Sequence, residues 1–413
     1  MAIESPPRPL PFRVLNGGYR AARRLGAHPL PLRKHALMAR ATRRARGLAD
    51  FGDPRFEHGL DRLIESLESE DRLNGFGRIL ATSHITNLLR QRLLFTEHLR
   101  QHPEICDEVI AKPIFLVGAP RTGTTITHHL LSQDDRFRYP ITWECDELHP
   151  PLDPATMRTD PRIKRSDKQI RRTLSLAPIS TPRIRSARGR PRSARCCMPM
   201  RSTARLSTSC STGQGYDRWL TGQDLTWVYQ EQKLLLQYMQ SGGLRPTESW
   251  LLKTPPHMEN IDKILAVFPD ARFVTTYREP TEIVASSCKL AGTVFGMVED
   301  DVDWHDHGRY MRWRTGRMLT RNVELRRQYA REPKRFIDFP MDRMVRNPMS
   351  CVQEIYEFFG IELTDEAHRK MSRFMDARGM AKRKPNVRLR ARHRRAVAAI
   401  AVLPRLLRNR GPP

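Results

Sequence analysis

The sequence predicts an α/β protein built on a mainly parallel sheet flanked by helices. Two segments carry this prediction, because each reads as an apolar strand, a turn and a helix. The first begins at Ile114 and the second at Trp250. Strands that alternate with helices form parallel sheets, since each helix returns the chain to the same end of the sheet. An N-terminal helical section precedes these units.

The N-terminal part is predicted as two pieces. Residues 1–50 form a basic N-terminal segment, with 11 Lys and Arg against Glu4 and Asp50. Residues 51–110 form a helical front section, because their apolar residues recur at helical spacing. One stripe comprises Leu60, Leu63, Ile64 and Leu67, and the next comprises Ile85, Leu88, Leu89 and Leu93.

The α/β domain is predicted over residues 111–377. Short apolar runs rich in strand formers alternate there with helix-like stretches and turns such as Pro269-Asp270. The predicted strands are 114–118, 250–253 and 271–277, and the predicted helices are 126–131, a stretch ending at Phe268, and 281–290.

Two stretches lack the composition and apolar periodicity of a globular domain. Residues 177–215 contain eight Arg and no acid, and the basic tail 378–413 contains twelve Lys and Arg and no acid. Each stretch has two interpretations, a disordered basic segment or a segment translated out of frame. Together with residues 1–50 they account for the excess charge, since the remaining residues carry −2 of the formal +27. The body is therefore not predicted to bind nucleic acid specifically, and a polyanion-binding protein is the weakest hypothesis.

Other classes of protein are disfavoured by composition. The seven Cys lie at irregular spacings without a Cys-x-x-Cys pair, which argues against a disulfide framework and a zinc knuckle. No apolar run reaches the length of a transmembrane helix, and the first thirty residues show no secretory signal. A cytoplasmic protein is expected.

A P-loop-like phosphate site is predicted at Gly118-Ala119-Pro120-Arg121-Thr122-Gly123-Thr124-Thr125. This loop follows a predicted strand and opens a helix, where backbone N–H groups can surround a phosphate. Thr124 stands where a Walker loop has lysine, which disfavours nucleoside-triphosphate hydrolysis. A tight turn without a ligand is the alternative.

A second anion site is predicted at Arg278 and Ser286. Arg278 follows a predicted strand, and Ser286 lies eight residues further on, two turns into the next helix. The forked donors of Arg suit a phosphate. A surface ion pair and an ordinary helical Ser are the alternative.

Together the two sites resemble those of the sulfotransferase family, which uses 3′-phosphoadenosine 5′-phosphosulfate as donor. Residues 120–125 resemble the family's 5′-phosphosulfate loop, in the form with Arg where many cytosolic members have Lys. Residues 268–286 resemble its 3′-phosphate strand and helix. The resemblance covers roughly residues 50–175 and 216–377, and the front helices are similar to those of bacterial members.

The resemblance implies roles for these residues. Arg121 would contact the 5′-phosphate and stabilise the leaving oxygen, while Thr122, Gly123, Thr124 and Thr125 cradle that phosphate. Arg278 and Ser286 would bind the 3′-phosphate. No metal is expected, because side chains and a helix terminus supply the positive charge.

The general base has two candidates. Glu144 matches the position of the catalytic Glu in sulfotransferases with the Arg-type loop and is the first choice. His257 resembles the neighbourhood of the catalytic His of cytosolic members, although two further residues separate it from Lys253. Lys253 would add positive charge near the transferred group. In the alternative, Glu144 is a solvated acid, His257 starts a helix and Lys253 snorkels from a strand end.

Two functional hypotheses remain open. The first is an active sulfotransferase that acts on a hydroxyl of a small molecule, glycan or lipid. The second is a damaged relative that retains only donor-nucleotide binding, because 177–215 replaces family sequence on the acceptor side. The tail 378–413 also replaces a basic loop over the donor, of which Arg378-Gly379 is the only similar part.

Overall fold

The computed structural model describes residues 9–176 and 213–377. Its sheet has five strands in the order β2-β3-β1-β4-β5, and every neighbouring pair is parallel. The predicted parallel α/β fold is confirmed. The strands are β1 (Ile114–Val117), β2 (Phe137–Arg138), β3 (Ser249–Lys253), β4 (Arg272–Tyr277) and β5 (Phe336–Pro340).

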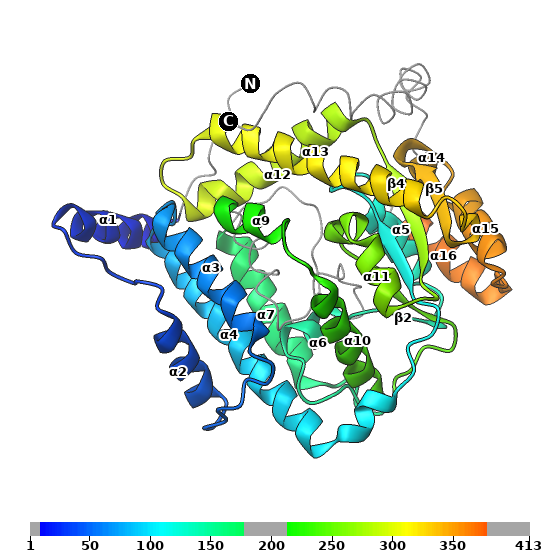
Figure 1. The fold of residues 1–413 in the computed structure, drawn as a ribbon, viewed down its shortest axis with the longest axis horizontal. Coiled ribbons are helices and arrows are strands. Elements are labelled where there is room, and N and C mark those ends of the chain that lie inside the picture. Colours follow the sequence, from blue (N-terminus) through cyan, green and yellow to red (C-terminus); the bar gives the residue numbers. More distant parts are fainter. Residues whose placement is uncertain (1–8, 177–212, 378–413) are drawn as a thin grey trace.

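Helices surround this sheet (Figure 1). Those before and between the first three strands are α1 (Leu10–Arg24), α2 (Lys34–Arg44), α3 (Arg55–Ser69), α4 (Gly75–Gln101), α5 (Thr124–Leu131), α6 (Thr142–Asp146), α7 (Pro161–Leu176), α9 (Gln214–Leu220) and α10 (Thr226–Ser241). Those that follow are α11 (Ile261–Val267), α12 (Pro280–Val298), α13 (Trp304–Gln328), α14 (Met341–Arg346), α15 (Pro348–Phe359) and α16 (Asp365–Ala377). Short 3₁₀ turns are η1 (Pro103–Asp107), η3 (Pro255–Glu259) and η4 (Pro333–Arg335).

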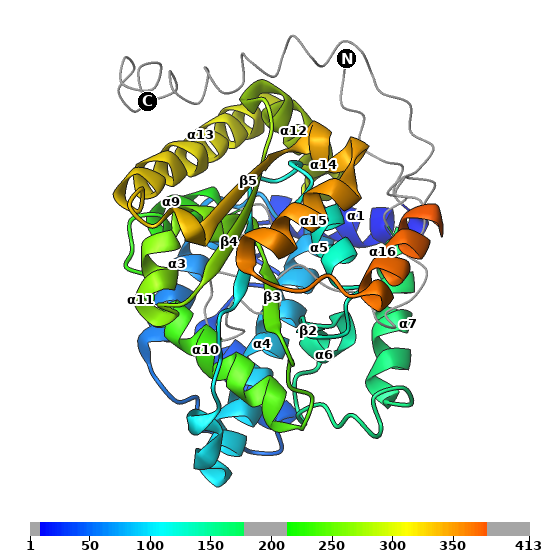
Figure 2. The same cartoon turned by 90° about the vertical axis from the view of Figure 1, so that its right-hand side faces the viewer.

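The sheet separates two apolar layers. Alternate strand residues face opposite sides, so Phe115 and Phe273 join a core with α4, α10 and α11, whereas Ile114 and Val274 join a core with α5, α15 and α16. Figure 2 shows α5, α15 and α16 on one side of the strands and α11 on the other. Strand β1 is central and completely buried, which explains its unbroken apolar sequence.

The predicted front helices are present as α3 and α4. Their predicted stripes face the interior, where Leu60, Leu63 and Leu67 are buried with Ile85 and Leu93. Residues 10–44 add two helices that the sequence analysis did not predict, α1 and α2. Leu37 and Ala41 of α2 are buried in the same core as the sheet residue Phe115.

The helix that follows β4 is longer than predicted. The sequence predicted its end at Leu290, but α12 continues to Val298. Gly292 alone would weaken the helix, because glycine has a low helix propensity. The burial of Phe295 and Val298 offsets this and stabilises the last turns of α12.

The two interpretations proposed for the basic stretches concern residues 177–215 and 378–413. Of these, residues 177–212 and 378–413 lie outside the described residues, whereas Gln214 and Gly215 begin α9. Among the helices of the described part, none is both long enough and apolar enough to span a bilayer.

Candidate active site

The predicted site residues follow four different strands at one edge of the sheet. All neighbouring strands are parallel, so their carboxyl ends lie together. Arg121 follows β1, Glu144 follows β2, Lys253 ends β3 and Arg278 follows β4. This edge is the usual position of ligand sites in open α/β sheets.

The loop between β1 and α5 has a backbone shaped for an anion. Gly118, Arg121 and Gly123 have φ values of 155°, 72° and 99°. The loop ends at Thr124, the first residue of α5, where unpaired N–H groups and the helix dipole favour negative charge. Residues with positive φ in a loop of this kind turn successive backbone N–H groups towards one point. The geometry therefore fits the predicted phosphate cradle.

The start of the loop is pressed against β4. A Cβ atom at Gly118 would lie 2.6 Å from the carbonyl oxygen of Thr276 and 2.7 Å from Oγ1 of Thr122. The Thr122 hydroxyl donates to the carbonyl oxygen of Ala119 at 2.8 Å and lies 3.0 Å from the hydroxyl of Thr276. Thr276 therefore fixes the loop, a role that nothing in its sequence context indicated.

The two predicted phosphate sites meet directly. Nε of Arg121 donates to Oγ of Ser286 at 2.9 Å, and Nη1 of Arg278 lies 3.5 Å from the carbonyl oxygen of Arg121. Arg278 also donates from Nε to Glu282 at 2.8 Å. This pair spans one helical turn, so its spacing in the sequence could have revealed it. The Arg-bearing loop and the beginning of α12 therefore form one continuous basic rim.

Lys253 lies beside the other end of the loop. Its Nζ donates to Oγ1 of Thr125 at 3.2 Å, and its side chain is almost completely buried. His128 lies nearby on α5. Burial lowers the pKa of His128 well below its ordinary value, and the charge of Lys253 lowers it further. The ammonium group is therefore placed at the end of the predicted phosphate loop, in a partly desolvated position.

Glu144 is held inside α6 by other protein groups. Its side chain is 1% exposed, its Oε1 accepts a hydrogen bond from Nη2 of Arg138, and its Oε2 lies 3.4 Å from the backbone N–H of Ile141. Arg138 also lies over the ring of Trp250, 5.0 Å from its centroid. Glu144 is therefore not the solvated acid of the alternative interpretation.

His257 lies in η3, in the first turn after Lys253-Thr254, and is completely buried. Its Nδ1 lies 3.0 Å from the hydroxyl of Tyr229, and its ring packs edge-on against Phe115. Among the described residues, its Nε2 has no hydrogen-bond partner. Burial lowers the pKa of His257 to about 3, so the imidazole is neutral at physiological pH.

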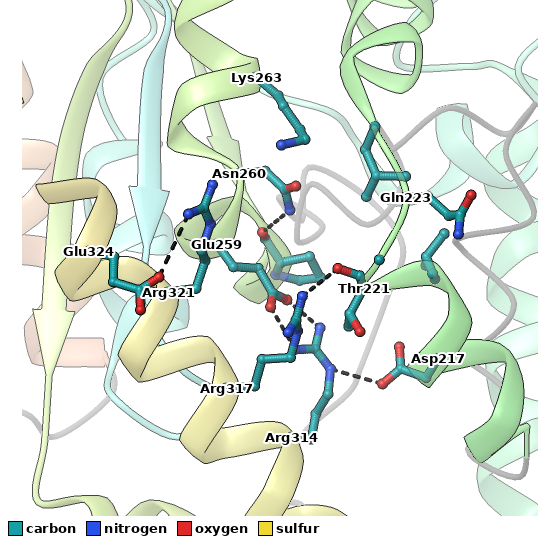
Figure 3. A pocket seen from close by; sticks show the side chains of 14 residues that line it. Asp217, Thr221, Gln223, Glu259, Asn260, Lys263, Arg314, Arg317, Arg321 and Glu324 are labelled. Carbon is teal, nitrogen blue, oxygen red and sulfur yellow. Dashed lines mark hydrogen bonds and ion pairs between the residues drawn. The ribbon is translucent and has the colours of Figure 1, made fainter. Parts of the chain in front are cut away.

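A polar pocket of about 390 Å³ is lined by residues of η3, α9, α13 and the loop after α9 (Figure 3). Its charged residues largely neutralise one another. Arg314 is ion-paired with Asp217 at 2.9 Å and with both oxygens of Glu259, and Arg321 is paired with Asp262 at 3.0 Å.

Arg314 ties three elements together near the site. It projects from α13, while Asp217 belongs to α9 and Glu259 belongs to η3. The hydroxyl of Tyr310 also donates to Asp217, at 2.7 Å. The pocket is not lined by any of the residues predicted to bind the donor. The buried cluster therefore supports the turn that carries His257.

The structure thus brings together most of the predicted residues. Arg121, Ser286 and Arg278 form one rim, and Lys253 reaches Thr125 at the other end of the loop. Glu144 and His257 lie on neighbouring segments that follow β2 and β3, each engaged with its own partners, Arg138 and Tyr229.

The fold and the site define an α/β protein with a P-loop-like loop at the carboxyl edge of a parallel sheet. Residues 113–365 match the sulfotransferase family. The match covers more than half of the chain, and the chain belongs to this family.

Solved structures of two sulfotransferases are similar in fold. One is STF9 from Mycobacterium avium, with a TM-score of 0.73 and 27% identity, over 83% of this chain and 88% of STF9. The other is STF1 from Mycobacterium tuberculosis H37Rv, with a TM-score of 0.75 and 26% identity, over 84% of this chain and 94% of STF1.

Two curated relatives match over 274 residues at 24% identity. Both are named omega-hydroxy-beta-dihydromenaquinone-9 sulfotransferase Stf3, one from Mycobacterium bovis and one from Mycobacterium tuberculosis. The match covers 62% of this chain and 65% of the length of these relatives.

Proposed function

We propose that this chain is a sulfotransferase that moves a sulfuryl group from 3′-phosphoadenosine 5′-phosphosulfate to a hydroxyl acceptor. The observation that carries the proposal is the hydrogen bond of 2.9 Å between Arg121 and Ser286. It joins the predicted 5′-phosphosulfate loop to the predicted 3′-phosphate helix, as a single donor nucleotide with anionic groups at both ends requires. Family membership supports the same reaction.

In this reaction the acceptor oxygen forms a bond to sulfur while the bond from sulfur to the phosphate oxygen breaks. The protein contributes mainly positioning and charge stabilisation, as in phosphoryl transfer. Arg121 and Lys253 lie at opposite ends of the loop, where their charges would stabilise the departing phosphate oxygen. The backbone of residues 122–125 and the hydroxyls of Thr124 and Thr125 would hold this phosphate, and Arg278 with Ser286 would hold the 3′-phosphate.

Glu144 is the proposed general base, and His257 is the second candidate. An efficient base has a pKa near the working pH. Burial lowers the pKa of His257 to about 3, which makes this imidazole a weak proton acceptor. The contact with Arg138 orients the carboxylate of Glu144 at the sheet edge that carries the loop. These observations favour Glu144.

Separate Glu144→Gln and His257→Asn variants test the assignment. The base is the residue whose replacement lowers turnover and removes the fall in rate at low pH, while donor binding and thermal stability are kept. An unchanged pH profile in Glu144→Gln would transfer the role to His257.

The acceptor is proposed to be a hydroxyl on a small molecule, a glycan or a lipid. The curated relatives are named for an omega-hydroxy menaquinone, a lipid, and this favours the lipid class. The cytoplasmic location and the absence of a metal and of a specific nucleic-acid partner stay predictions from the sequence.

A damaged relative that retains donor binding is the competing function, because residues 177–215 depart from the family pattern on the acceptor side. Two assays separate the proposals. An active enzyme binds 3′-phosphoadenosine 5′-phosphate and transfers labelled sulfate to at least one member of a panel of lipid, glycan and phenolic hydroxyls. Nucleotide binding without any transfer would support the damaged relative.

A further inference from the structure

Helix α1 has one face fixed on the protein. The ring of Phe12 packs edge-on against Phe76 of α4 at a centroid distance of 4.4 Å. Asn16 is buried and accepts a hydrogen bond from the backbone N–H of Phe76 at 3.0 Å. Tyr19 lies so close to Gly75 that a Cβ atom there would be 2.9 Å away. Phe12, Asn16 and Tyr19 therefore define the inward face.

The opposite face of α1 is apolar and exposed. Leu10 and Val14 are 68% and 67% exposed, and Ala21 is also exposed; Leu25, the C-cap residue directly after α1, is 87% exposed. At 100° per residue Leu10, Val14 and Ala21 fall within about 40° of one another, on one side of the helix, and Leu25 follows its last turn. The inward face of α1 is packed against the protein, whereas the apolar residues of the opposite face remain exposed to water.

The charge of α1 is entirely positive. The helix contains Arg13, Arg20, Arg23 and Arg24 and no acidic residue. Arg13 and Arg24 are exposed, and on the helical projection they border the apolar face on one side. Arg20 and Arg23 are paired with Asp300 and Asp71 of the body. Within residues 9–176 and 213–377, neither Arg13 nor Arg24 has an acidic partner, so the exposed side of α1 combines apolar residues with positive charge.

The position of α1 makes this face accessible. Figure 1 shows α1 at the left edge of the molecule, projecting beyond α3 and α4. A projecting helix presents a convex surface, which suits a flat partner better than an enclosed ligand. An apolar stripe bordered by Arg is typical of helices that lie in the interface of a membrane, where Arg contacts anionic headgroups and apolar residues enter the acyl boundary.

We propose that α1 is a membrane-docking helix for anionic phospholipid bilayers, with Leu10, Val14 and Leu25 inserted and Arg13 and Arg24 at the headgroups. The docking itself stands without the proposed reaction. Its use rests on the proposed function, because an enzyme held at a bilayer surface would meet a lipid acceptor whose hydroxyl lies at that surface.

The test is sedimentation of the full-length chain with vesicles of phosphatidylcholine, with and without phosphatidylglycerol. The wild type is expected to bind the anionic vesicles and to dissociate in high salt. A Leu10→Glu/Val14→Glu variant should lose at least about tenfold in affinity, because apolar insertion is replaced by charge. Arg13→Gln and Arg24→Gln should each weaken binding about fivefold.

The matched control is Val109→Glu, since Val109 is 76% exposed and lies outside α1, just before β1. This variant should bind vesicles like the wild type. Nucleotide binding and thermal unfolding confirm that every variant is folded. They also separate this proposal from the proposed function, because vesicle binding and donor binding can fail independently.

Three results would overturn the docking proposal. The wild type could fail to bind anionic vesicles. The Leu10→Glu/Val14→Glu variant could bind as well as the wild type, which would assign binding to another basic stretch such as residues 378–413. Light scattering could show a dimer that the same two substitutions dissociate, which would make the exposed face of α1 an interface between copies of the chain.

Discussion

Replacing Gly118 by Ala is expected to damage the donor site while leaving the rest of the fold intact. The new Cβ would lie 2.6 Å from the carbonyl oxygen of Thr276, below the 3.0 Å that real Cβ atoms respect. This neighbour is backbone in β4, so the loop must move instead. The residue also has φ of 155°, which side chains rarely adopt.

The magnitude follows from the strain. A residue forced into such a conformation costs about 1–3 kcal/mol. If the loop relieves this strain by leaving its anion-binding shape, the same free energy is lost from donor binding. The dissociation constant of 3′-phosphoadenosine 5′-phosphate should then rise about five- to 150-fold. Isothermal titration calorimetry measures this constant directly, without knowledge of the acceptor.

The control for this prediction is Gly308→Ala. Gly308 lies inside α13, and a Cβ atom there would meet nothing within 4 Å. Ala is favoured over Gly in a helix by about 1 kcal/mol, so this variant should be slightly more stable and bind the nucleotide normally. Wild-type affinity in Gly118→Ala would refute the assignment of the loop as the phosphate cradle.

Two further predictions concern the buried side chains of Arg314 and His257. Arg314→Met leaves Asp217 and Glu259 buried without their counter-charge, so urea unfolding should show a free energy of unfolding lower by about 3–5 kcal/mol. The control Arg331→Met, at an exposed position, should change this free energy little. Equal effects of the two substitutions would contradict the role of Arg314. For His257, the unfolded chain takes up a proton below about pH 6.5, but the folded chain resists protonation to about 3. The free energy of unfolding should therefore fall as the pH falls through this range, by at most about 1.4 kcal/mol per unit from this residue, and His257→Asn should flatten the slope. Identical slopes in the two proteins would show that His257 is accessible to protons in the folded state.

The sequence predicted the parts of the fold that depend on local pattern. The strand at Ile114 is completely apolar because it is central in the sheet, and the loop from Gly118 to Gly123 has glycines where the backbone needs positive φ. The edge strands β2 and β5 escaped prediction. Strand β2 has only two residues, and β5 includes Asp338 and Pro340, which are poor strand formers.

Contacts that depend on the path of the folded chain could not be predicted in the same way. Arg121 and Ser286 are 165 positions apart, and only the parallel arrangement of β1 and β4 brings their loops together. The ion pair of Glu144 with Arg138 depends on the path of the chain from β2 into α6. Helix α1 lies in the stretch that is predicted only as a basic segment, and its one completely buried residue is the polar Asn16, so no buried apolar stripe like those of α3 and α4 marks it.

The central claim is that two separate loops grip one nucleotide by its two anionic ends. Calorimetric titration with 3′-phosphoadenosine 5′-phosphate and with adenosine 5′-monophosphate, which lacks the 3′-phosphate, tests it most directly. The wild type should bind the bisphosphate far more tightly. Arg278→Ala should abolish this preference, whereas Arg121→Ala should weaken both ligands alike. Persistence of the wild-type preference in Arg278→Ala would contradict the claim.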